Sequence, residues 1–237
     1  MVEIWRIELL KIDLKQVLSY KEELLSNIVE YSILIFISYF VWSAFNSGEN
    51  VLAYITVVYA MISFSYYRII KYIFSAYRNG TIIFNLIRPV RLVKIVFWSW
   101  ISKSIRKVVP VALLLIAIAL NPNVYFIAST FFALYIMFLI GYIVATIAYE
   151  SYFEWGVGNL LRVLAYFTGG GIPIFLMPDF VKKLIMLSPF FYATTAPWMA
   201  ARDLNIVFIQ IALIVVLTII AFITESKMME KFTVVGV

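Results

Sequence analysis

The stretch VVPVALLLIAIALNPNVYFIASTFFALYIMFLIGYIVATIAY, residues 108–149, contains no charged side chain. A helix that crosses a bilayer needs about 20 mostly apolar residues. The sequence Asn-Pro-Asn at 121–123 is a turn signal, so this stretch predicts two spanning helices joined by a very short connection. The first of them reaches spanning length when Lys103, Arg106 and Lys107 extend their charged ends to water.

The composition of the whole chain agrees with a membrane protein. Of its 237 residues, 64% are hydrophobic and 14% are charged, whereas soluble domains average roughly 45–50% and about 25%. A soluble fold of this size buries at most about 70–75% of its chain surface, so it cannot hide this much apolar area. The absence of His and Cys excludes disulfide frameworks, thiolate nucleophiles and Ser-His-Asp triads.

The rest of the chain predicts an all-α integral membrane protein with six transmembrane helices and no separate soluble domain. The expected spans are about 28–47, 50–70, 101–120, 124–149, 157–177 and 206–224. Before the first span, apolar residues fall on one helical face, namely Ile7, Leu10, Leu14, Val17 and Leu18. This pattern predicts an N-terminal amphipathic surface helix over 1–27, because a signal peptide would need a basic start and a cleavage site. Residues 1–237 are thus expected to form a single transmembrane domain.

The distribution of basic residues predicts the orientation. With six spans, sixteen of the nineteen Lys and Arg residues fall on the side that carries both termini, and three fall on the other side. Positive charge is retained on the cytoplasmic side near span ends. We therefore expect a multi-pass protein of the cell (plasma) membrane with both the N- and C-termini in the cytoplasm.

The loop between the second and third spans is basic and patterned. Residues 68–107 hold nine basic and no acidic side chains. Within the segment 78–94, a turn at Asn79-Gly80 precedes Thr81, which can cap a helix. The apolar residues Ile82, Ile83, Leu86 and Ile87 then follow at helical spacing, and Arg88-Pro89 ends the pattern. We predict a short cytoplasmic helix that docks on another protein; the alternative is positive-inside bias with binding of anionic lipid headgroups.

A second irregular region precedes the last span. Gly169, Gly170, Gly171 and Pro173 interrupt an apolar run, and broken backbone at membrane depth is tolerated only where protein or a watery cavity covers it. Residues 178–200 then predict a re-entrant helical hairpin in the outer leaflet, acting as a lid over an outward exit. The alternative is an ordinary interfacial loop with aromatic anchors.

Taken in order, these features resemble the permease subunits of ABC-2 type ATP-binding-cassette exporters, in their six-span branch. The likeness covers a surface helix before the first span, the run RNGTIIFNLIRPV at 78–90, the run GGGIP at 169–173 and the run PFFYATTAP at 189–197. Relatives often place an acidic residue between the Gly and the Leu-x-Arg-Pro of the first run, and residues 81–85 have none.

The resemblance implies two functional regions. The residues expected to couple to an ATPase are Arg78, Gly80, Thr81, Leu86, Ile87, Arg88 and Pro89. Those expected at an outer gate are Gly169, Gly170, Gly171, Pro173, Pro189, Phe190, Tyr192 and Pro197. It also implies two ATP-binding-cassette ATPase subunits as partners, a second permease copy or a related permease, and membrane lipids, with no nucleic acid. ATP and Mg²⁺ belong to the ATPase, since this chain has no phosphate-binding Gly-x-x-x-x-Gly-Lys-Ser/Thr motif, and we expect no cofactor or catalytic residue here.

The expected function is therefore outward movement of a hydrophobic or amphipathic compound, such as a drug, peptide or lipid. Three alternatives remain open. An ion-coupled secondary transporter usually needs ionisable groups inside the membrane, and Glu30, Glu150 and Glu154 fall only at predicted span ends. A lipid-modifying membrane enzyme would need clustered carboxylates, for which Glu150 and Glu154 are a narrow basis. An accessory membrane subunit is the third.

Overall fold

A computed structural model gives the fold, and it describes residues 21–45, 51–64, 66–82, 90–105, 108–120, 122–151 and 153–234. These residues form helices and turns, without a strand among them. The helices, in chain order, are α2 (Lys21–Ser43), α3 (Val51–Ile62), α4 (Tyr67–Arg78), α6 (Leu92–Ile105), α7 (Val108–Leu120), α8 (Val124–Ala148), α9 (Glu154–Thr168), the 3-10 turn η1 (Ile174–Leu176), α10 (Asp179–Met186), α11 (Pro189–Thr194), α12 (Ala196–Ala200) and α13 (Asn205–Val234). The expected surface helix over 1–27 lies almost wholly outside the described residues.

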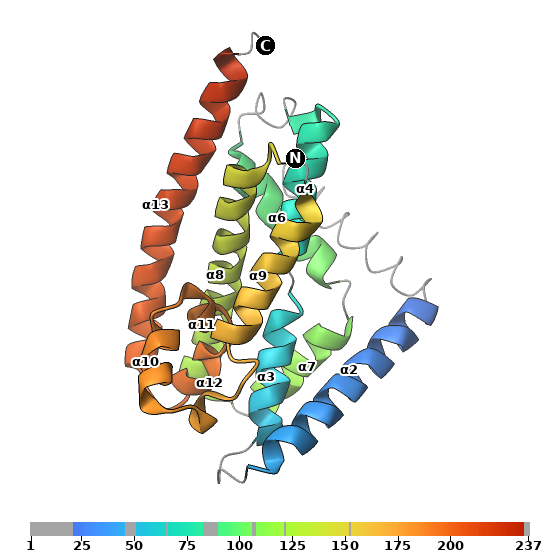
Figure 1. Cartoon of the computed structure of the whole chain (residues 1–237), viewed down its shortest axis with the longest axis vertical. Helices are drawn as coiled ribbons and strands as arrows, with labels where there is room; N and C mark the ends of the chain where they lie inside the picture. Colours follow the sequence, from blue (N-terminus) through green and yellow to red (C-terminus); the bar gives the residue numbers. More distant parts are fainter. Residues whose placement is uncertain are drawn as a thin grey trace.

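Helix α8 is the centre of the bundle (Figure 1). It packs along α13 and also contacts α4, α11 and α12. Its middle is buried on most sides, with Ala133, Ile136, Met137 and Tyr142 fully covered, which explains its continuous apolar sequence. Asn123 caps the start of α8, because its side chain accepts a hydrogen bond from the Tyr125 amide at 2.8 Å.

Three stretches of the described chain are long and apolar enough to cross a membrane. They are Val51–Arg78, Val124–Ala148 and Asn205–Lys231, while Ile28–Ser43 and Val109–Ala119 are shorter apolar helices. The predictions of an all-helical chain and of membrane-spanning helices are thus confirmed for the described residues. The number six stays a prediction.

Several predicted boundaries differ from those of the structure. The predicted span 50–70 corresponds to α3, which ends at Ile62, and α4, which runs on to Arg78. The predicted span 101–120 corresponds to α7 and to the end of α6, which already begins at Leu92. A hydrogen bond from Arg68 to the carbonyl of Lys103 joins α4 to α6. In the predicted span 157–177, α9 begins at Glu154 and stops at Thr168, just before the three glycines that interrupt the apolar run.

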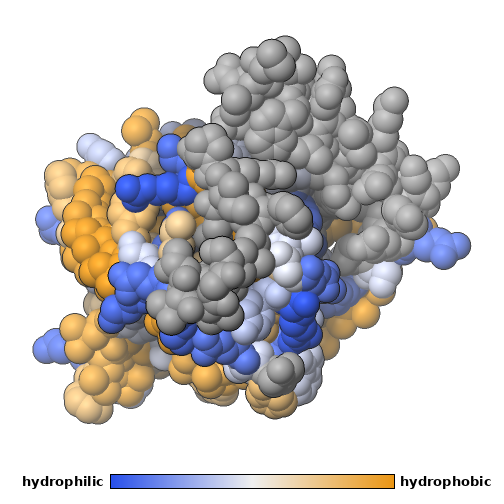
Figure 2. All heavy atoms as spheres, turned by 90° about the horizontal axis from the view of Figure 1, so that it is seen from above, coloured by the Kyte–Doolittle hydropathy of each residue, from blue (hydrophilic) through white to orange (hydrophobic). Residues whose placement is uncertain are grey.

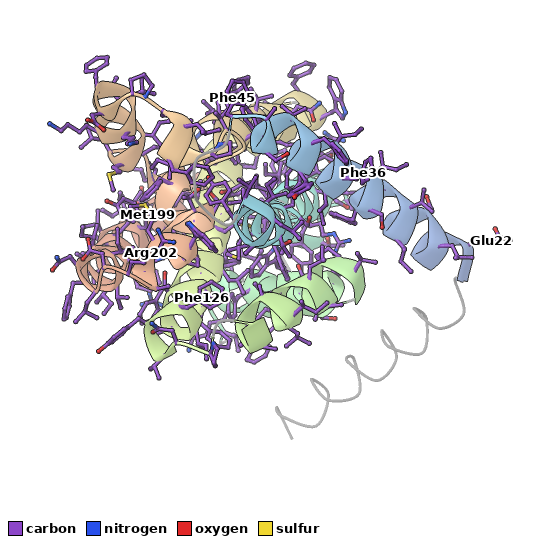
Figure 3. All side chains as sticks on the ribbon, turned by 90° about the horizontal axis from the view of Figure 1, so that it is seen from below. Glu22, Phe36, Phe45, Phe126, Met199 and Arg202 are labelled. Carbon is purple, nitrogen blue, oxygen red and sulfur yellow. The ribbon has the colours of Figure 1, made fainter. Side chains whose placement is uncertain are left out.

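Helix α2 stands at one side of the bundle (Figures 1 and 3), where it contacts α3 and α7. Among its described side chains, only Tyr31 and Ser38 are buried, and Ser38 shares a 2.8 Å hydrogen bond with the Tyr59 hydroxyl of α3. Phe36 is 63% exposed. A helix this apolar and this uncovered needs lipid or another protein around it.

The two ends of the bundle differ in polarity. We call the end at which α4, α8 and α13 finish the basic end. Seen from there, hydrophilic residues gather around the middle of the face, and hydrophobic residues form much of its rim (Figure 2). At this end the Lys231 ammonium of α13 lies 3.0 Å from the Glu150 carboxylate, just after α8. The hydrogen bond from Lys231, followed by one from the Tyr149 hydroxyl, holds the pKa of the Glu150 carboxyl below its usual range.

This ion pair gives a pH-dependent contribution to stability. Because the pKa of Glu150 is lower in the folded chain, the stabilisation is present above its ordinary value of 4.5 and is lost as the pH falls through the lowered value. We expect Lys231→Gln to lower the melting temperature slightly at pH 7, where both groups are charged and largely exposed. The difference from wild type should vanish in strong acid and shrink in about 1 M salt. Lys227→Gln, on the same helix, is the control; an equal loss there would assign the effect to net charge.

Candidate functional site

A buried carboxylate joins three helices beneath the basic end. Glu225 of α13 is 6% exposed. Its Oε1 accepts a hydrogen bond from the backbone amide of Leu92, the first residue of α6, at 3.1 Å. Its Oε2 accepts one from the Tyr142 hydroxyl of α8 at 2.8 Å. A carboxylate taken out of water needs such partners, so Glu225 fixes where α6 starts against α8 and α13.

The sequence prediction missed Glu225 because it ended the last span at residue 224. The helix continues for a further ten residues, to Val234. A signal was present, since the buried residues Gln210, Leu217, Ala221, Glu225 and Met228 recur at intervals that keep them on one side of a helix. A charged residue on this stripe indicates a helix that continues with a paired charge inside.

The predicted coupling segment is held at both of its flanks. On one side, the Arg78 guanidinium at the end of α4 lies 3.4 Å from the Glu154 carboxylate at the start of α9. On the other side, the Arg91 guanidinium lies 4.4 Å from the ring centre of Phe222 on α13, a cation–π contact. The predicted coupling segment is therefore attached to α9 through Arg78 and to α13 through Arg91.

Of the predicted coupling residues, Arg78, Gly80 and Thr81 are described. Gly80 has a φ of +69°, which favours glycine, and this confirms the turn expected after Arg78. The Thr81 hydroxyl donates a hydrogen bond to the Ala76 carbonyl of α4 at 3.3 Å. Leu86, Ile87, Arg88 and Pro89 lie outside the described residues.

Helix α9 connects the basic end to the predicted outer gate. Its 15 residues correspond to about 22 Å of helix. It lies close against α4 at Gly158, where a Cβ would meet the Tyr67 ring at 2.6 Å, so only glycine permits this approach. The helix runs from Glu154, which pairs with Arg78, to Thr168, which precedes Gly169.

The three glycines form a tight, buried turn at the far end of α9. The Gly169 carbonyl accepts hydrogen bonds from the hydroxyls of Thr194 and Thr195. The Gly170 carbonyl accepts one from the Tyr54 hydroxyl at 2.9 Å. Gly170 has a φ of +104°, and a Cβ there would overlap the Thr195 hydroxyl. The broken backbone is therefore covered by protein, as membrane depth requires.

The residues after this turn fold into the bundle rather than over it. Ser188 caps α11 by accepting a hydrogen bond from the Phe190 amide at 3.3 Å, and Pro189 takes the first position of the helix. All residues from 191 to 197 are buried. Gln210 of α13 holds them in place, since its Nε2 donates to the Tyr192 carbonyl at 2.9 Å and to the Ser129 carbonyl at 3.2 Å.

The structure therefore brings the predicted outer-gate residues together. Gly169, Gly170, Gly171, Pro173, Tyr192 and Pro197 are buried, and Pro189 and Phe190 are half-buried. Helix α10 is not buried in this way, because Phe180 and Leu184 on it and Leu187 just after it are exposed. In the view from the other end, Met199 and Arg202 lie beside Phe126 of α8 (Figure 3). The predicted hairpin is thus an exposed α10 followed by buried α11 and α12.

The carboxylates that an enzyme would need are dispersed. Glu150 pairs with Lys231 and Glu154 with Arg78, so the two residues bind cations on different helices. Across the described residues, no group of three or more Asp and Glu side chains is close enough to hold a metal ion.

In comparisons with protein-family models, curated proteins and solved structures, no match to this chain was found. A functional assignment therefore rests on the residues and contacts described above.

We predict that Glu225 and Tyr142 depend on each other energetically. Glu225→Gln leaves either the Leu92 amide or the Tyr142 hydroxyl without its acceptor, and Tyr142→Phe leaves the carboxylate with one hydrogen bond fewer. Each change should cost about 1–3 kcal/mol in the free energy of unfolding, and the double variant less than the sum of both. Urea unfolding in detergent measures the costs. Tyr135→Phe on the same helix is the control, and additive costs would show that the two groups do not interact.

We also predict that the glycine turn tolerates no side chain at its centre. Gly170→Ala should strongly destabilise the protein, because the new methyl group would overlap Thr195 and Tyr54 at a φ of +104°. Gly80→Ala is the matched control: its φ is also positive, but no atom lies within 4 Å of the added Cβ, so it should cost only about 1–2 kcal/mol. Melting temperatures compare the two variants. Equal losses would show that packing around Gly170 contributes little.

Proposed function

We propose that this chain is the membrane-spanning permease subunit of an ATP-driven ABC exporter, with ATP hydrolysed by a separate subunit. The observation that carries the proposal is the continuous connection from Arg78 through Glu154 and α9 to the Gly169 carbonyl. It links the two regions that the resemblance assigns to ATPase coupling and to outward release.

In this proposal the basic end faces the cytoplasm and receives the ATPase. The sequence from Arg68 to Lys107 has no acidic residue, so the segment has no carboxylate of its own to neutralise it. Its flanks rest on α9 through Arg78 and on α13 through Arg91. A displacement of the segment by the ATPase would therefore be applied to the start of α9 and to the side of α13.

The outer end of α9 is where such a displacement would act. A shift of α9 along its axis would move the Gly169 carbonyl relative to Thr194 and Thr195. Those hydroxyls belong to α11 and to the residue that follows it, and Gln210 attaches α11 to α13. Packed interfaces move between discrete arrangements rather than bend continuously, so an open and a closed hairpin are the two states we expect.

The remaining parts of the proposal concern what surrounds the chain. The exposed apolar surface of α2, which includes Phe36 and Phe40, suits membrane lipid or a second permease. Two permeases and two ATPases would form the complete exporter in the plasma membrane. The many aromatic side chains of the bundle suit a hydrophobic or amphipathic cargo that passes between the permeases.

The test begins with purification of the tagged chain from its native membranes. The expected result is an ATP-binding-cassette ATPase that co-purifies in equal amount. In the reconstituted complex, Arg78→Glu should place two carboxylates together and lower the permease-dependent ATPase rate several-fold. The double change Arg78→Glu with Glu154→Arg should restore the rate, because it restores an opposite pair.

Lys227→Glu, on the exposed side of α13, is the control for the change in net charge and should leave the rate unchanged. Absence of any ATPase partner would overturn the proposed function. A rate that is lost with Arg78→Glu but not restored by the double change would remove α9 from the coupling path alone.

Glu225 favours one second candidate, an ion-coupled transporter. It is a carboxylate buried within a stretch long enough to span a membrane, and such groups often carry protons or cations. For this candidate, liposomes containing the purified chain alone should conduct protons, measured with a trapped pH-sensitive dye, and Glu225→Gln should abolish the flux. For the exporter, liposomes without the ATPase should show no flux above that of empty liposomes.

A further inference from the structure

A cavity of about 580 Å³ lies between α6, α8 and α13. Its size is within the range of roughly 300–1,000 Å³ that is typical of sites for small molecules. Its wall combines the cationic side chains of Arg91 and Lys94 with aromatic side chains, namely Phe97, Tyr135, Phe138 and Phe222. Part of the wall, including Arg91 and Lys94, belongs to the predicted coupling segment 78–94, and the rest comes from α6, α8 and α13.

The aromatic side of the cavity is ordered by ring contacts. The Phe97 ring of α6 lies 4.9 Å from that of Phe138 and 5.7 Å from that of Tyr135, both on α8 and both in edge-on geometry. Phe138 is fully buried and fixes the other two rings in place. Phe97 and Tyr135 are half-buried and offer an apolar, preformed surface, which suits a hydrocarbon chain.

The cationic side consists of Arg91 and Lys94, both exposed. Within the described part of the chain, no ion pair involves either residue. Glu225, which binds the amide of the neighbouring Leu92, does not line the cavity, and both of its oxygens already accept hydrogen bonds. Two positive charges beside an apolar wall are complementary to an amphiphile with an anionic head.

The position of the cations along α13 matches that of lipid headgroups. Arg91 lies over Phe222, which is 17 residues after the start of α13 at Asn205, or about 25 Å of helix. The hydrocarbon core of a bilayer is about 30 Å thick. The cations therefore lie near one boundary of the core, and the aromatic wall extends from them toward its interior. Val215, Val216 and Ile219, which are exposed on α13, continue this apolar surface outside the cavity.

We propose that this cavity binds an anionic phospholipid, with its phosphate on Arg91 and Lys94 and one acyl chain against Phe97 and Tyr135. The site does not depend on the proposed transport function. Because Arg91 and Lys94 lie in the C-terminal part of the predicted coupling segment 78–94 and Arg91 contacts α13, a bound lipid would also stabilise that part of the segment.

The test measures lipid binding to the purified full chain in detergent. Dioleoyl phosphatidylglycerol should raise the melting temperature more than dioleoyl phosphatidylcholine does, and it should remain bound in native mass spectra. Arg91→Gln with Lys94→Gln should lower the apparent affinity for phosphatidylglycerol about 10- to 30-fold. Lys182→Gln with Lys183→Gln removes the same charge from α10 at the opposite end and should leave the affinity unchanged.

A second variant tests the acyl-chain contacts separately from the two cationic side chains. Thr218→Phe, on the α13 wall of the cavity, fills apolar space, keeps both cations and should weaken phosphatidylglycerol binding; it decides the outcome if the charge variant does not fold. Equal phosphatidylglycerol binding by wild type and by both cavity variants would overturn the proposal. Stabilisation by inorganic phosphate as strong as that by the lipid would overturn the acyl-chain site, and so would a dimer whose formation displaces the lipid.

Discussion

Buried polar groups in an apolar bundle must find partners within the protein, and a small number of such groups determine how these helices meet. The Glu225 carboxylate fixes the start of α6 against α8 and α13. The Gln210 amide attaches α11 to α13 and α8. The Gly169 carbonyl, released where α9 ends, is taken up by Thr194 and Thr195. Apolar contacts supply the area of the core, but these groups select one arrangement, since leaving any of them unpaired costs about 1–3 kcal/mol.

Helix α9 connects two ends of the molecule that are held together by different kinds of contact. At the basic end, charged residues bring together segments far apart in the sequence, as in the pairs Arg78–Glu154 and Glu150–Lys231. At the other end, hydroxyl and amide groups bonded to backbone carbonyls hold α9, α11 and α13 together, and the ion pair Asp179–Lys182 stays within α10. A charged end can respond to a partner protein in water, and an end built from hydrogen bonds within the bundle can change its packing without exposing charge. This division of properties is what a protein would need to transmit a signal across a bilayer.

Local signals predicted the features that depend on neighbouring residues. The Asn-Pro-Asn turn and the uncharged run after it predicted α8 with its boundaries, and Ser188-Pro189 together with the glycines predicted the break and restart of the chain before α13. Features fixed by distant partners were missed. The early start of α6 at Leu92 and the continuation of α13 past residue 224 both involve Glu225. A charged residue ends an uncharged stretch of sequence, so the prediction ended the last span just before Glu225. The glycines predicted the break after α9, but not that the Gly169 carbonyl is bonded by residues 25 and 26 positions later.

In the proposed exporter, the basic end faces the cytoplasm and is covered there by an ATPase. The chain has no cysteine, so single thiols report the position of each end directly. In intact cells, a membrane-impermeant maleimide should label Leu187→Cys, which is 81% exposed on the opposite end, and should not label Thr81→Cys. Once the membrane is opened, Thr81→Cys should react, and it should react more slowly when the ATPase is bound. Labelling of Thr81→Cys from outside intact cells would contradict the account.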